Sequence, residues 1–367
     1  MDDVPLSWIS VEGYRSVRDL RLKLAPINVL TGPNGCGKSN LYNSLLLLAR
    51  AAQGQFARAI AQEGGTPSVF WAGGERVRYT RKKPPTRIVL AFESDEYGYE
   101  LQVGLPTPFP SLFSLDPEVK AESIWPAGTK RRPLMLDRKA TSAWVRNQTG
   151  NFVEYPLGLL GNESVLSQII EPHLYPEISA LRQEMLRWRF YHHFRTDADS
   201  PLRQPQIAFR TPILSHDASD LAASLQTIVE NGDGVSLDET IASAFQGAQL
   251  HVKGGGAGLS INLDIPGLLR PLDARELSDG QLRFLCLCAA LLSPRPPSLL
   301  ALNEPETSLH PDLIDPLARL IVRASRDTQI WITTHSRALT ERIEEHSGIP
   351  RIQLTLNNGE TQLATAP

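Results

Sequence analysis

A glycine-rich stretch near the amino terminus has the residue types and the spacing needed to bind phosphate. Residues 32–39 read Gly-Pro-Asn-Gly-Cys-Gly-Lys-Ser, which is a glycine, four further residues and then Gly-Lys-Ser. Glycines let backbone N–H groups point inward around phosphate oxygens, and a helix that starts behind them adds positive potential. Lys38 would reach the β- and γ-phosphates, and the hydroxyl of Ser39 would ligate Mg²⁺. The pattern therefore predicts a nucleotide-binding P-loop.

The segments on both sides of this loop have the character that a P-loop requires. Residues 27–30 form a short apolar run typical of a strand, and residues 40–52 have the apolar spacing of a buried helix. Upstream, residues 8–11 and 20–24 alternate between apolar and polar side chains, as half-buried strands do. A glycine-rich turn that arose by chance would require neither a strand before it nor a helix after it. Because both are expected here, we favour the P-loop.

Chemically useful side chains also stand at the ends of predicted strands in the last hundred residues. Residues 298–302 and 330–333 read as continuous apolar strands, and a helix is expected between them within residues 312–325. Such a strand–helix–strand unit belongs to a parallel sheet buried on both faces. Glu304 follows the first strand and His335 the second, at the sheet edge where α/β proteins place catalytic groups.

A short polar segment precedes the apolar helix expected over residues 282–292. Residues 277–281 read Leu-Ser-Asp-Gly-Gln. A serine that caps a helix is common and would mean little alone. Here it follows the P-loop and precedes the strand that carries Glu304, and this order gives it weight.

Taken together, these segments resemble the ATP-binding-cassette type P-loop ATPases of the RecF, SMC and OLD group. The similar motifs are Walker A at residues 32–39, the LSGGQ signature at 277–281, Walker B at 299–304, the D-loop at 306–310 and the switch histidine His335. The Gly-Tyr-Arg-Ser run at residues 13–16 and the Glu-Thr-Ser-Leu-His-Pro run after Glu304 look more like RecF or OLD ATPases than transporter cassettes. The resemblance covers residues 1–50 and 270–340.

The resemblance implies an α/β P-loop NTPase with an ABC-type head. We expect an N-terminal, strand-rich ATPase lobe with the P-loop over residues 1–95 and an insertion whose fold is not defined over 96–180. A C-terminal α/β lobe with the signature, Walker B and the switch histidine follows over 181–367. The insertion region is proline-rich, and half of the 28 prolines lie between Pro84 and Pro212, which excludes long helices and therefore coiled-coil arms.

The resemblance also implies ATP and Mg²⁺ as cofactors and a second copy, or a related head, as the partner in an ATP-dependent dimer. Glu304 and His335 would be the catalytic residues, and Ser39 and Asn303 the metal ligands. The residues expected to bind the nucleotide are Asn34, Gly35, Cys36, Gly37, Lys38, Ser39 and Asn40 of the P-loop, with Ser278 and Gly280 of the signature reaching the γ-phosphate on the other subunit.

Two residues depart from the family pattern. Asn303 stands where the family has the aspartate that holds Mg²⁺ through water, so an acceptor oxygen is kept and a negative charge is lost. Asp279 replaces a signature glycine and adds a negative charge near the incoming phosphate. We expect nucleotide binding to survive both changes and hydrolysis to be affected.

We therefore expect an ATPase whose heads dimerise around ATP and which acts in DNA repair or DNA maintenance in the cytoplasm. Two alternatives remain open. Asn303 makes a non-hydrolysing, ATP-gated scaffold credible. Few residues follow His335, whereas OLD nucleases carry a further catalytic domain, so the chain could be the ATPase subunit of a phage-defence complex with a separate effector and no nuclease domain of its own.

The composition and charge of the chain exclude several classes of protein. Apolar residues make up 41% and charged residues 21% of the chain, which is ordinary for a globular protein, and the net charge of −3 excludes a histone-like cationic binder. Three cysteines cannot form a disulfide framework in 367 residues. The longest apolar run, residues 284–292, is far shorter than the about 20 residues that span a bilayer, and no signal peptide opens the chain, so we expect no membrane insertion.

Basic residues gather near the end of the predicted N-terminal lobe. The densest cluster consists of Arg76, Arg78, Arg81, Lys82, Lys83 and Arg87, with Tyr79 among them. We favour a solvated loop over a contact with DNA for this cluster, and DNA stays an open partner. Neighbouring His192 and His193 lack metal-like partners at a suitable spacing, so we expect no zinc site.

Overall fold

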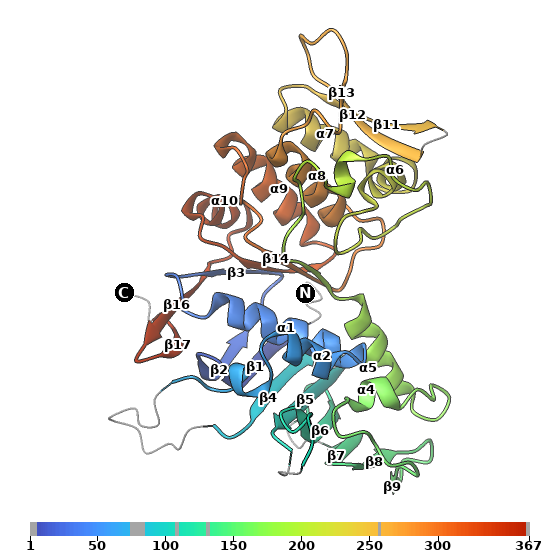
Figure 1. Ribbon diagram of the computed structural model, residues 1–367, viewed down its shortest axis with the longest axis vertical. Helices are drawn as coiled ribbons and strands as arrows, with labels where there is room; N and C mark the ends of the chain where they lie inside the picture. Colours follow the sequence, from blue (N-terminus) through green and yellow to red (C-terminus); the bar gives the residue numbers. More distant parts are fainter. Residues whose placement is uncertain (1–5, 74–84, 107–109, 130–132, 256–257, 365–367) are drawn as a thin grey trace. The chain divides into compact units, whose positions relative to one another are not determined.

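The computed structural model describes residues 6–73, 85–106, 110–129, 133–255 and 258–364 (Figure 1). By their internal contacts the residues form two compact units. Unit 1 consists of residues 1–25, 30–188 and 352–367, and unit 2 of residues 26–29 and 189–351. Each unit is described by itself.

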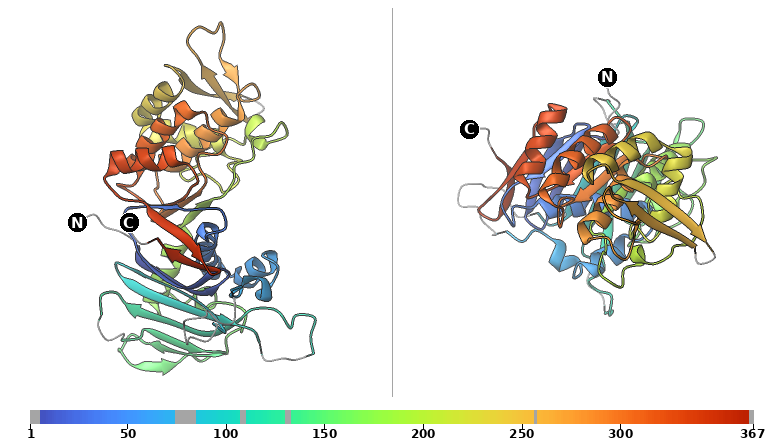
Figure 2. Two further views of the ribbon diagram at one scale, coloured as in Figure 1. Left: turned by 90° about the vertical axis from the view of Figure 1, so that its left-hand side faces the viewer. Right: turned by 90° about the horizontal axis from the view of Figure 1, so that it is seen from above.

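Unit 1 is built on an eight-stranded sheet in which every neighbouring pair is antiparallel (Figure 2, left). Its strand order is β2-β1-β4-β5-β6-β7-β8-β9. The strands are β1 (Leu6–Tyr14), β2 (Val17–Lys23), β4 (Ile88–Ser94), β5 (Tyr97–Gly104), β6 (Glu118–Pro126), β7 (Leu136–Lys139), β8 (Ser142–Arg146) and β9 (Phe152–Glu154). Side chains alternate between buried and exposed along β2, as expected for a sheet with one face packed on a core.

Helices cover this sheet within unit 1. They are α1 (Lys38–Ala52), α2 (Phe56–Gln62), α3 (Thr66–Val69), α4 (Val165–Gln168) and α5 (Pro176–Arg187). Leu41, Leu45, Leu48 and Ala52 recur at helical spacing along α1 and are all buried, and α1 contacts β1, α2, α4 and α5. The P-loop helix is thereby fixed by packing along its length.

Strand β3 (Ile27–Thr31) leads into the P-loop. Its last residues, Leu30 and Thr31, pair in parallel with Ile352 and Gln353 of β16 (Ile352–Asn357), which turns back into β17 (Glu360–Leu363). This small arrangement belongs to unit 1 and brings the C-terminal hairpin against the start of the chain, where β17 also contacts β2.

Unit 2 contains a parallel sheet surrounded by helices. Strands β10 (Arg189–Tyr191), β14 (Leu299–Asn303) and β15 (Gln329–Thr333) pair in that order, all in parallel, and the Ile330 N–H donates to Pro26 O at the start of β3. The helices are α6 (Leu221–Asn231), α7 (Gly234–Ala244), α8 (Asp279–Leu291), α9 (Ile314–Ala324) and α10 (Arg337–Ser347), with two 3₁₀ turns, η1 (Pro201–Arg203) and η2 (Pro311–Leu313). A three-stranded antiparallel sheet adds β11 (Gln249–Gly255), β12 (Gly258–Asp264) and β13 (Leu272–Asp273).

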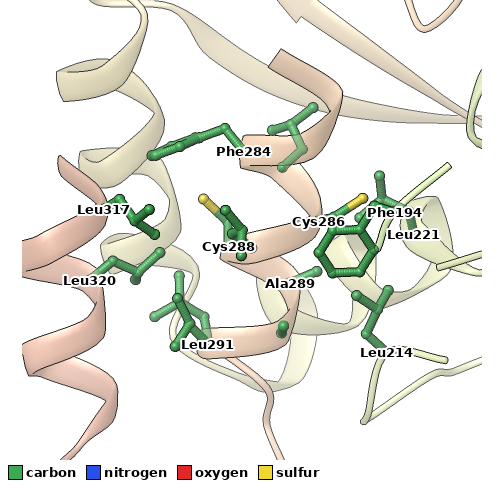
Figure 3. Close-up of a cluster of buried hydrophobic side chains, with 14 of the residues drawn as sticks. Phe194, Leu214, Leu221, Phe284, Cys286, Cys288, Ala289, Leu291, Leu317 and Leu320 are labelled. Carbon is green, nitrogen blue, oxygen red and sulfur yellow. The ribbon is translucent and has the colours of Figure 1, made fainter. Parts of the chain in front are cut away.

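Helix α8 forms the centre of the core of unit 2 (Figure 3). Cys286 points toward Phe194 and Leu221, whereas Cys288 points toward Leu317 and Leu320 of α9 (Figure 3). Both thiols are fully buried, and burial raises the pKa of each. Two positions apart on α8, these cysteines are therefore core residues on different faces of the helix.

Most elements that flank the motifs agree with the sequence predictions. The strands expected over 8–11, 20–24 and 27–30 are confirmed as β1, β2 and β3, and the helix over 40–52 as α1. The strands predicted at 298–302 and 330–333 are β14 and β15, and the helix between them is α9. The proposed division of the chain at 95 and 180 stays a prediction, and residue 95 falls in the turn between the paired strands β4 and β5. Among the described helices, none combines the length and the apolar character needed to cross a membrane.

Candidate nucleotide site

The P-loop lies in unit 1, between β3 and the first turn of α1. Gly37 is the N-cap of α1 and has φ 103°, a conformation that side-chain-bearing residues rarely adopt. A Cβ at this position would lie 2.1 Å from Thr361 Oγ1. No side chain in the described part of the chain caps the first turn of α1, which leaves its backbone N–H groups for an anion.

Lys38 is almost fully buried inside this loop. Its ammonium donates hydrogen bonds to Gly32 O at 2.8 Å and Pro33 O at 3.2 Å, and lies 4.0 Å from Cys36 Sγ. Cys36 is fully buried, whereas Asn34, Gly35 and Ser39 are exposed. The lysine and the exposed residues are therefore placed where the P-loop pattern requires them, with the thiol of Cys36 serving as packing.

A chain of hydrogen bonds supports the loop from behind. Asn40 Nδ2 donates to Ser16 Oγ at 2.7 Å, and Ser16 Oγ shares a hydrogen bond of 2.7 Å with Thr361 Oγ1. Ser16 belongs to the Gly-Tyr-Arg-Ser run that resembles RecF proteins, so the structure gives this run a position beside the P-loop. The side-chain amide of Asn40 is engaged with Ser16, which indicates a supporting role for that group.

The Walker B residues lie at the carboxyl end of β14 in unit 2. Asn303 Oδ1 accepts a hydrogen bond from Thr333 Oγ1 at 2.7 Å, which fixes the amide of Asn303. Glu304 has φ 46°, in the left-handed region, and its N–H donates to Thr333 O at 2.8 Å. Such a conformation costs about 1–3 kcal/mol and persists where surrounding contacts enforce it, as is common at functional sites.

Glu304 and His335 meet across the ends of β14 and β15. Glu304 Oε1 lies 3.2 Å from His335 Nε2, and the two side chains are 39% and 40% exposed. The pair is therefore ordered by a direct contact and still accessible to a ligand.

Glu306 organises the segment that carries His335. Its Oε1 accepts hydrogen bonds from Thr334 Oγ1 at 2.5 Å, His335 N at 3.2 Å and Ser336 N at 3.1 Å. With one oxygen committed to three donors, Glu306 holds the loop after β15 in place.

Arg283 connects the signature helix α8 to the Walker B turn. It is 5% exposed, and its Nη2 donates to Glu304 O at 3.0 Å. Burial lowers the pKa of Arg283, and the nearby carboxylates of Glu304 and Glu306 oppose this shift. The sequence reasoning did not select this residue, because a buried arginine within an apolar helix leaves no motif.

The signature segment forms the N-terminus of α8. Ser278 is the N-cap: its hydroxyl accepts from Gln281 N at 3.2 Å, and Gln281 Oε1 accepts from Ser278 N at 2.9 Å, a reciprocal capping box. Among the residues that the structure describes, the hydroxyl of Ser278 only accepts, so its hydrogen can be donated to a ligand. A Cβ on Gly280 would lie 2.7 Å from Ser308 O in the D-loop segment, so glycine is required there by close approach.

Asp279, the unusual residue of the signature, is paired with an arginine that the sequence reasoning missed. Arg203 Nη2 lies 2.7 Å from Asp279 Oδ1. The two residues are 76 positions apart. No local pattern could have connected them.

The structure thus brings the signature, Walker B and the switch histidine together within unit 2 and places the P-loop in unit 1. The hydroxyl of Ser39 and the amide oxygen of Asn303 are hard oxygen donors of the kind that Mg²⁺ accepts. Among the described residues, no group of three or more His, Cys, Asp or Glu side chains could hold a metal ion. Of the basic cluster, residues 76–83 lie outside the described residues, and Arg87 Nη1 donates to Gln102 Oε1 at 3.1 Å.

Comparison with known proteins identifies the architecture. The family model described as "AAA domain, putative AbiEii toxin, Type IV TA system" matches residues 27–341. No curated protein matches the chain in sequence.

Solved SMC heads share the fold over nearly the whole chain. An SMC head bound to the C-terminal winged-helix domain of ScpA aligns with a TM-score of 0.52 at 13% identity, covering 98% of this chain and 97% of that one. An SMC head with an extended coiled coil, bound to the C-terminal domain of ScpA derived from Pyrococcus furiosus, aligns with a TM-score of 0.50 at 12% identity, covering 98% and 96%. The SMC head domain from Thermotoga maritima is 15% identical over 99% of each chain, with a TM-score of 0.47. The predicted α/β P-loop fold with an ABC-type head is confirmed.

Proposed function

Because the chain belongs to this AAA-domain family and is a P-loop ATPase of the RecF/SMC ABC type, we propose that it binds Mg-ATP, hydrolyses it and uses it to associate two heads. The observation that carries the proposal is the contact between Glu304 and His335 at the carboxyl ends of two parallel strands. In this position Glu304 orients or deprotonates the attacking water, and His335 holds the γ-phosphate.

The residues of unit 1 bind the phosphates. The N-terminus of α1 and the N–H groups of the glycine-rich loop surround them, and the ammonium of Lys38 exchanges its two carbonyl partners for phosphate oxygens. This exchange is favourable because a phosphate oxygen carries a negative charge opposite to that of the ammonium, whereas a carbonyl oxygen carries only a partial charge.

Ser39 and Asn303 are the protein ligands that we assign to Mg²⁺. The ion neutralises charge on the phosphates. Because Asn303 lacks the negative charge of the usual aspartate, the nucleotide's own phosphates supply most of the attraction for the ion. Thr333 keeps the amide oxygen of Asn303 oriented. The expected result is a working but weakened metal site.

Association of two heads follows from the position of the signature. Ser278 offers a hydroxyl hydrogen and Gly280 a backbone N–H at the N-terminus of α8, where an anion is favoured. We assign these groups to the γ-phosphate held by the P-loop of a second copy or a related head. ATP then becomes part of the interface, and its hydrolysis releases the heads.

DNA repair or maintenance in the cytoplasm is the role we propose first, by analogy with RecF-like ATPases. The family description names a toxin and a type IV toxin–antitoxin system, which favours a second candidate: an ATPase subunit that acts with a separate effector. The structures of SMC heads with a bound ScpA domain support the idea that a head of this fold can carry a separate protein.

Phosphate release from ATP by the full chain, with Mg²⁺ present, tests the central proposal. We expect turnover that is lost on Glu304→Gln and kept on Glu341→Gln. Glu341 is a suitable control because it is a glutamate on the surface of α10, paired with Arg337. No turnover in the parent, combined with ATP-dependent association, would instead support the non-hydrolysing scaffold.

A further inference from the structure

The Arg203 guanidinium makes an unusually complete set of contacts around the signature. Nε donates to Thr196 O at 2.9 Å and to Asp197 O at 3.2 Å. Nη1 donates to Leu277 O at 2.7 Å, Arg275 O at 3.2 Å and Ala274 O at 3.4 Å, while Nη2 binds Asp279 Oδ1 at 2.7 Å. All three nitrogens are used, and the Arg203 side chain is only 11% exposed. Arg203 therefore holds the segment before Ser278 and the residue after it at the same time.

Asp279 would oppose phosphate binding if it were unpaired. It is the first residue of α8, so its carboxylate lies where the helix N-terminus otherwise favours anions. Its side chain is 59% exposed, and it lies between the two signature groups that we assign to a γ-phosphate, Ser278 and Gly280. The Arg203 ion pair cancels this charge and leaves the partial positive charge of the helix terminus to act.

A cavity next to the signature segment offers space for a group from another molecule. A cavity of about 890 Å³ in unit 2 has the four residues 278–281 in its lining, together with residues 308–313 of the D-loop segment and η2. Asp279 thus borders the space into which another head's nucleotide would enter. Arg203 does not line that cavity and acts on it through Asp279 and the backbone.

We propose that Arg203 is a positioning residue for ATP-dependent head association: it neutralises Asp279 and holds Ser278 in place, so that a signature containing an aspartate still accepts the γ-phosphate of a second copy's ATP. This inference rests on the proposed function, in which the signature binds ATP across the head interface. It predicts that Arg203 influences association and leaves binding of ATP to the P-loop unchanged.

Sedimentation velocity with ATP, in the Glu304→Gln background that preserves the nucleotide, measures the association. Arg203→Ala should weaken the ATP-dependent dimer at least ~10-fold, the loss expected for one hydrogen bond to a charged group. Affinity for a fluorescent ATP analogue at protein concentrations where only monomer exists should stay within about twofold of the parent. Arg203→Lys should give an intermediate loss, because an ammonium restores the charge and cannot reproduce the planar set of donors.

A double variant distinguishes an effect of the Asp279 charge from a loss of structure in Arg203→Ala. Removing the carboxylate in Arg203→Ala/Asp279→Gly should recover a large part of the lost association, whereas a purely structural role of Arg203 would leave the double variant as weak as Arg203→Ala. Salt gives a second readout: added NaCl should strengthen association of Arg203→Ala by screening Asp279, with no such gain in the double variant.

Association of Arg203→Ala equal to that of its parent would overturn the inference and leave the proposed function intact. A double variant as weak as Arg203→Ala, or a salt response shared by both, would also overturn it. A parent that stays monomeric with ATP would overturn the proposed head association and the inference with it. If Arg203→Ala has a lowered thermal midpoint, comparison of Arg203→Gln with Arg203→Gln/Asp279→Gly provides the same test in chains that keep a hydrogen-bond donor, but no cation, at position 203.

Discussion

Glu304 and His335 contact each other directly, with Oε1 and Nε2 3.2 Å apart, although each is the polar end of a different strand. The parallel pairing of Asn303 with Thr333 brings the two strand ends into register. Glu306 then fixes the backbone of His335 from one side, and Arg283 fixes the carbonyl of Glu304 from the other. The proposed general base and the proposed phosphate-binding imidazole thus share one network of supporting contacts.

Substitution of Lys38 by alanine should abolish tight ATP binding. The variant loses an ammonium that is held inside the loop, and a hydrogen bond to a charged group contributes about 1.5–3 kcal/mol. We therefore expect the dissociation constant for Mg-ATP, measured by equilibrium dialysis, to increase at least ~10-fold. Arg50→Ala, at the far end of α1, is the matched control, because it removes a cation from the same helix. Equal binding by Lys38→Ala and the parent would remove the P-loop assignment.

Glu304→Gln should slow ATP turnover at least ~10²-fold, the lower range for general-base catalysis, and leave ATP binding unchanged. Single-turnover phosphate release measures this. The isosteric amide keeps the side chain's size, so that a fall in kcat at constant nucleotide affinity reports the chemistry. Unchanged turnover would transfer the role of the base to another group, of which Glu306 is the nearest carboxylate in sequence.

Asn303→Asp should tighten the metal site. The change restores the negative charge that the usual Walker B aspartate carries, and it keeps an acceptor for Thr333 Oγ1. We expect half-maximal turnover at a lower Mg²⁺ concentration than in the parent, measured by titrating Mg²⁺ back after EDTA treatment. Asn303→Ala should shift the titration in the opposite direction. An identical Mg²⁺ dependence in all three proteins would exclude Asn303 as a metal ligand.

Glu122→Gln should destabilise unit 1. Glu122 and Arg138 form a fully buried ion pair at 3.2 Å, and Glu122 also accepts hydrogen bonds from Tyr99 Oη at 2.5 Å and Val165 N at 2.9 Å. Neutralising one partner leaves a buried charge unpaired, which costs about 3–5 kcal/mol. Urea unfolding followed by tryptophan fluorescence should show a lower midpoint. A second change, Arg138→Met, should recover part of the loss, and no recovery would mean that the hydrogen bonds dominate.

DNA binding by the basic cluster, if it occurs, should be weak and independent of sequence. If four or five of the six basic residues contact phosphates, the logarithm of the binding constant should fall against the logarithm of the salt concentration with a slope of about −4. Each neutralised phosphate contributes about −0.9 to this slope. Titration of labelled duplex at two salt concentrations, with the parent and Arg78→Ala/Lys82→Ala/Lys83→Ala, measures this slope. Equal binding by both proteins would exclude the cluster as the contact. No binding by either, with ATP present, would favour a protein partner.

The sequence was most informative where the chemistry is local. The P-loop, the strands before Glu304 and His335 and the helix after the signature could all be predicted, because each depends on a few neighbouring residues with a clear pattern. The eight-stranded sheet of unit 1 could not: the alternation at 8–11 and 20–24 predicted two of its strands, but the order in which eight strands pair depends on partners far apart in the sequence. The supports of the site also escaped prediction: Ser16 meets Thr361 across 345 positions, and Arg203 meets Asp279 across 76. Such partners are set by the tertiary fold.

The sharing of β3 between the two units has a consequence for how the chain is made. Its first three residues, 27–29, belong to unit 2, where Asn28 Nδ2 donates to Ile330 O across 302 positions. During synthesis β3 leaves the ribosome early, whereas its neighbour β15 is made only after almost the entire chain. Contacts of such long range form slowly, and an unpaired strand edge attracts other chains in the meantime. We therefore expect a fragment limited to residues 189–351, which lacks β3, to aggregate more readily than the full chain.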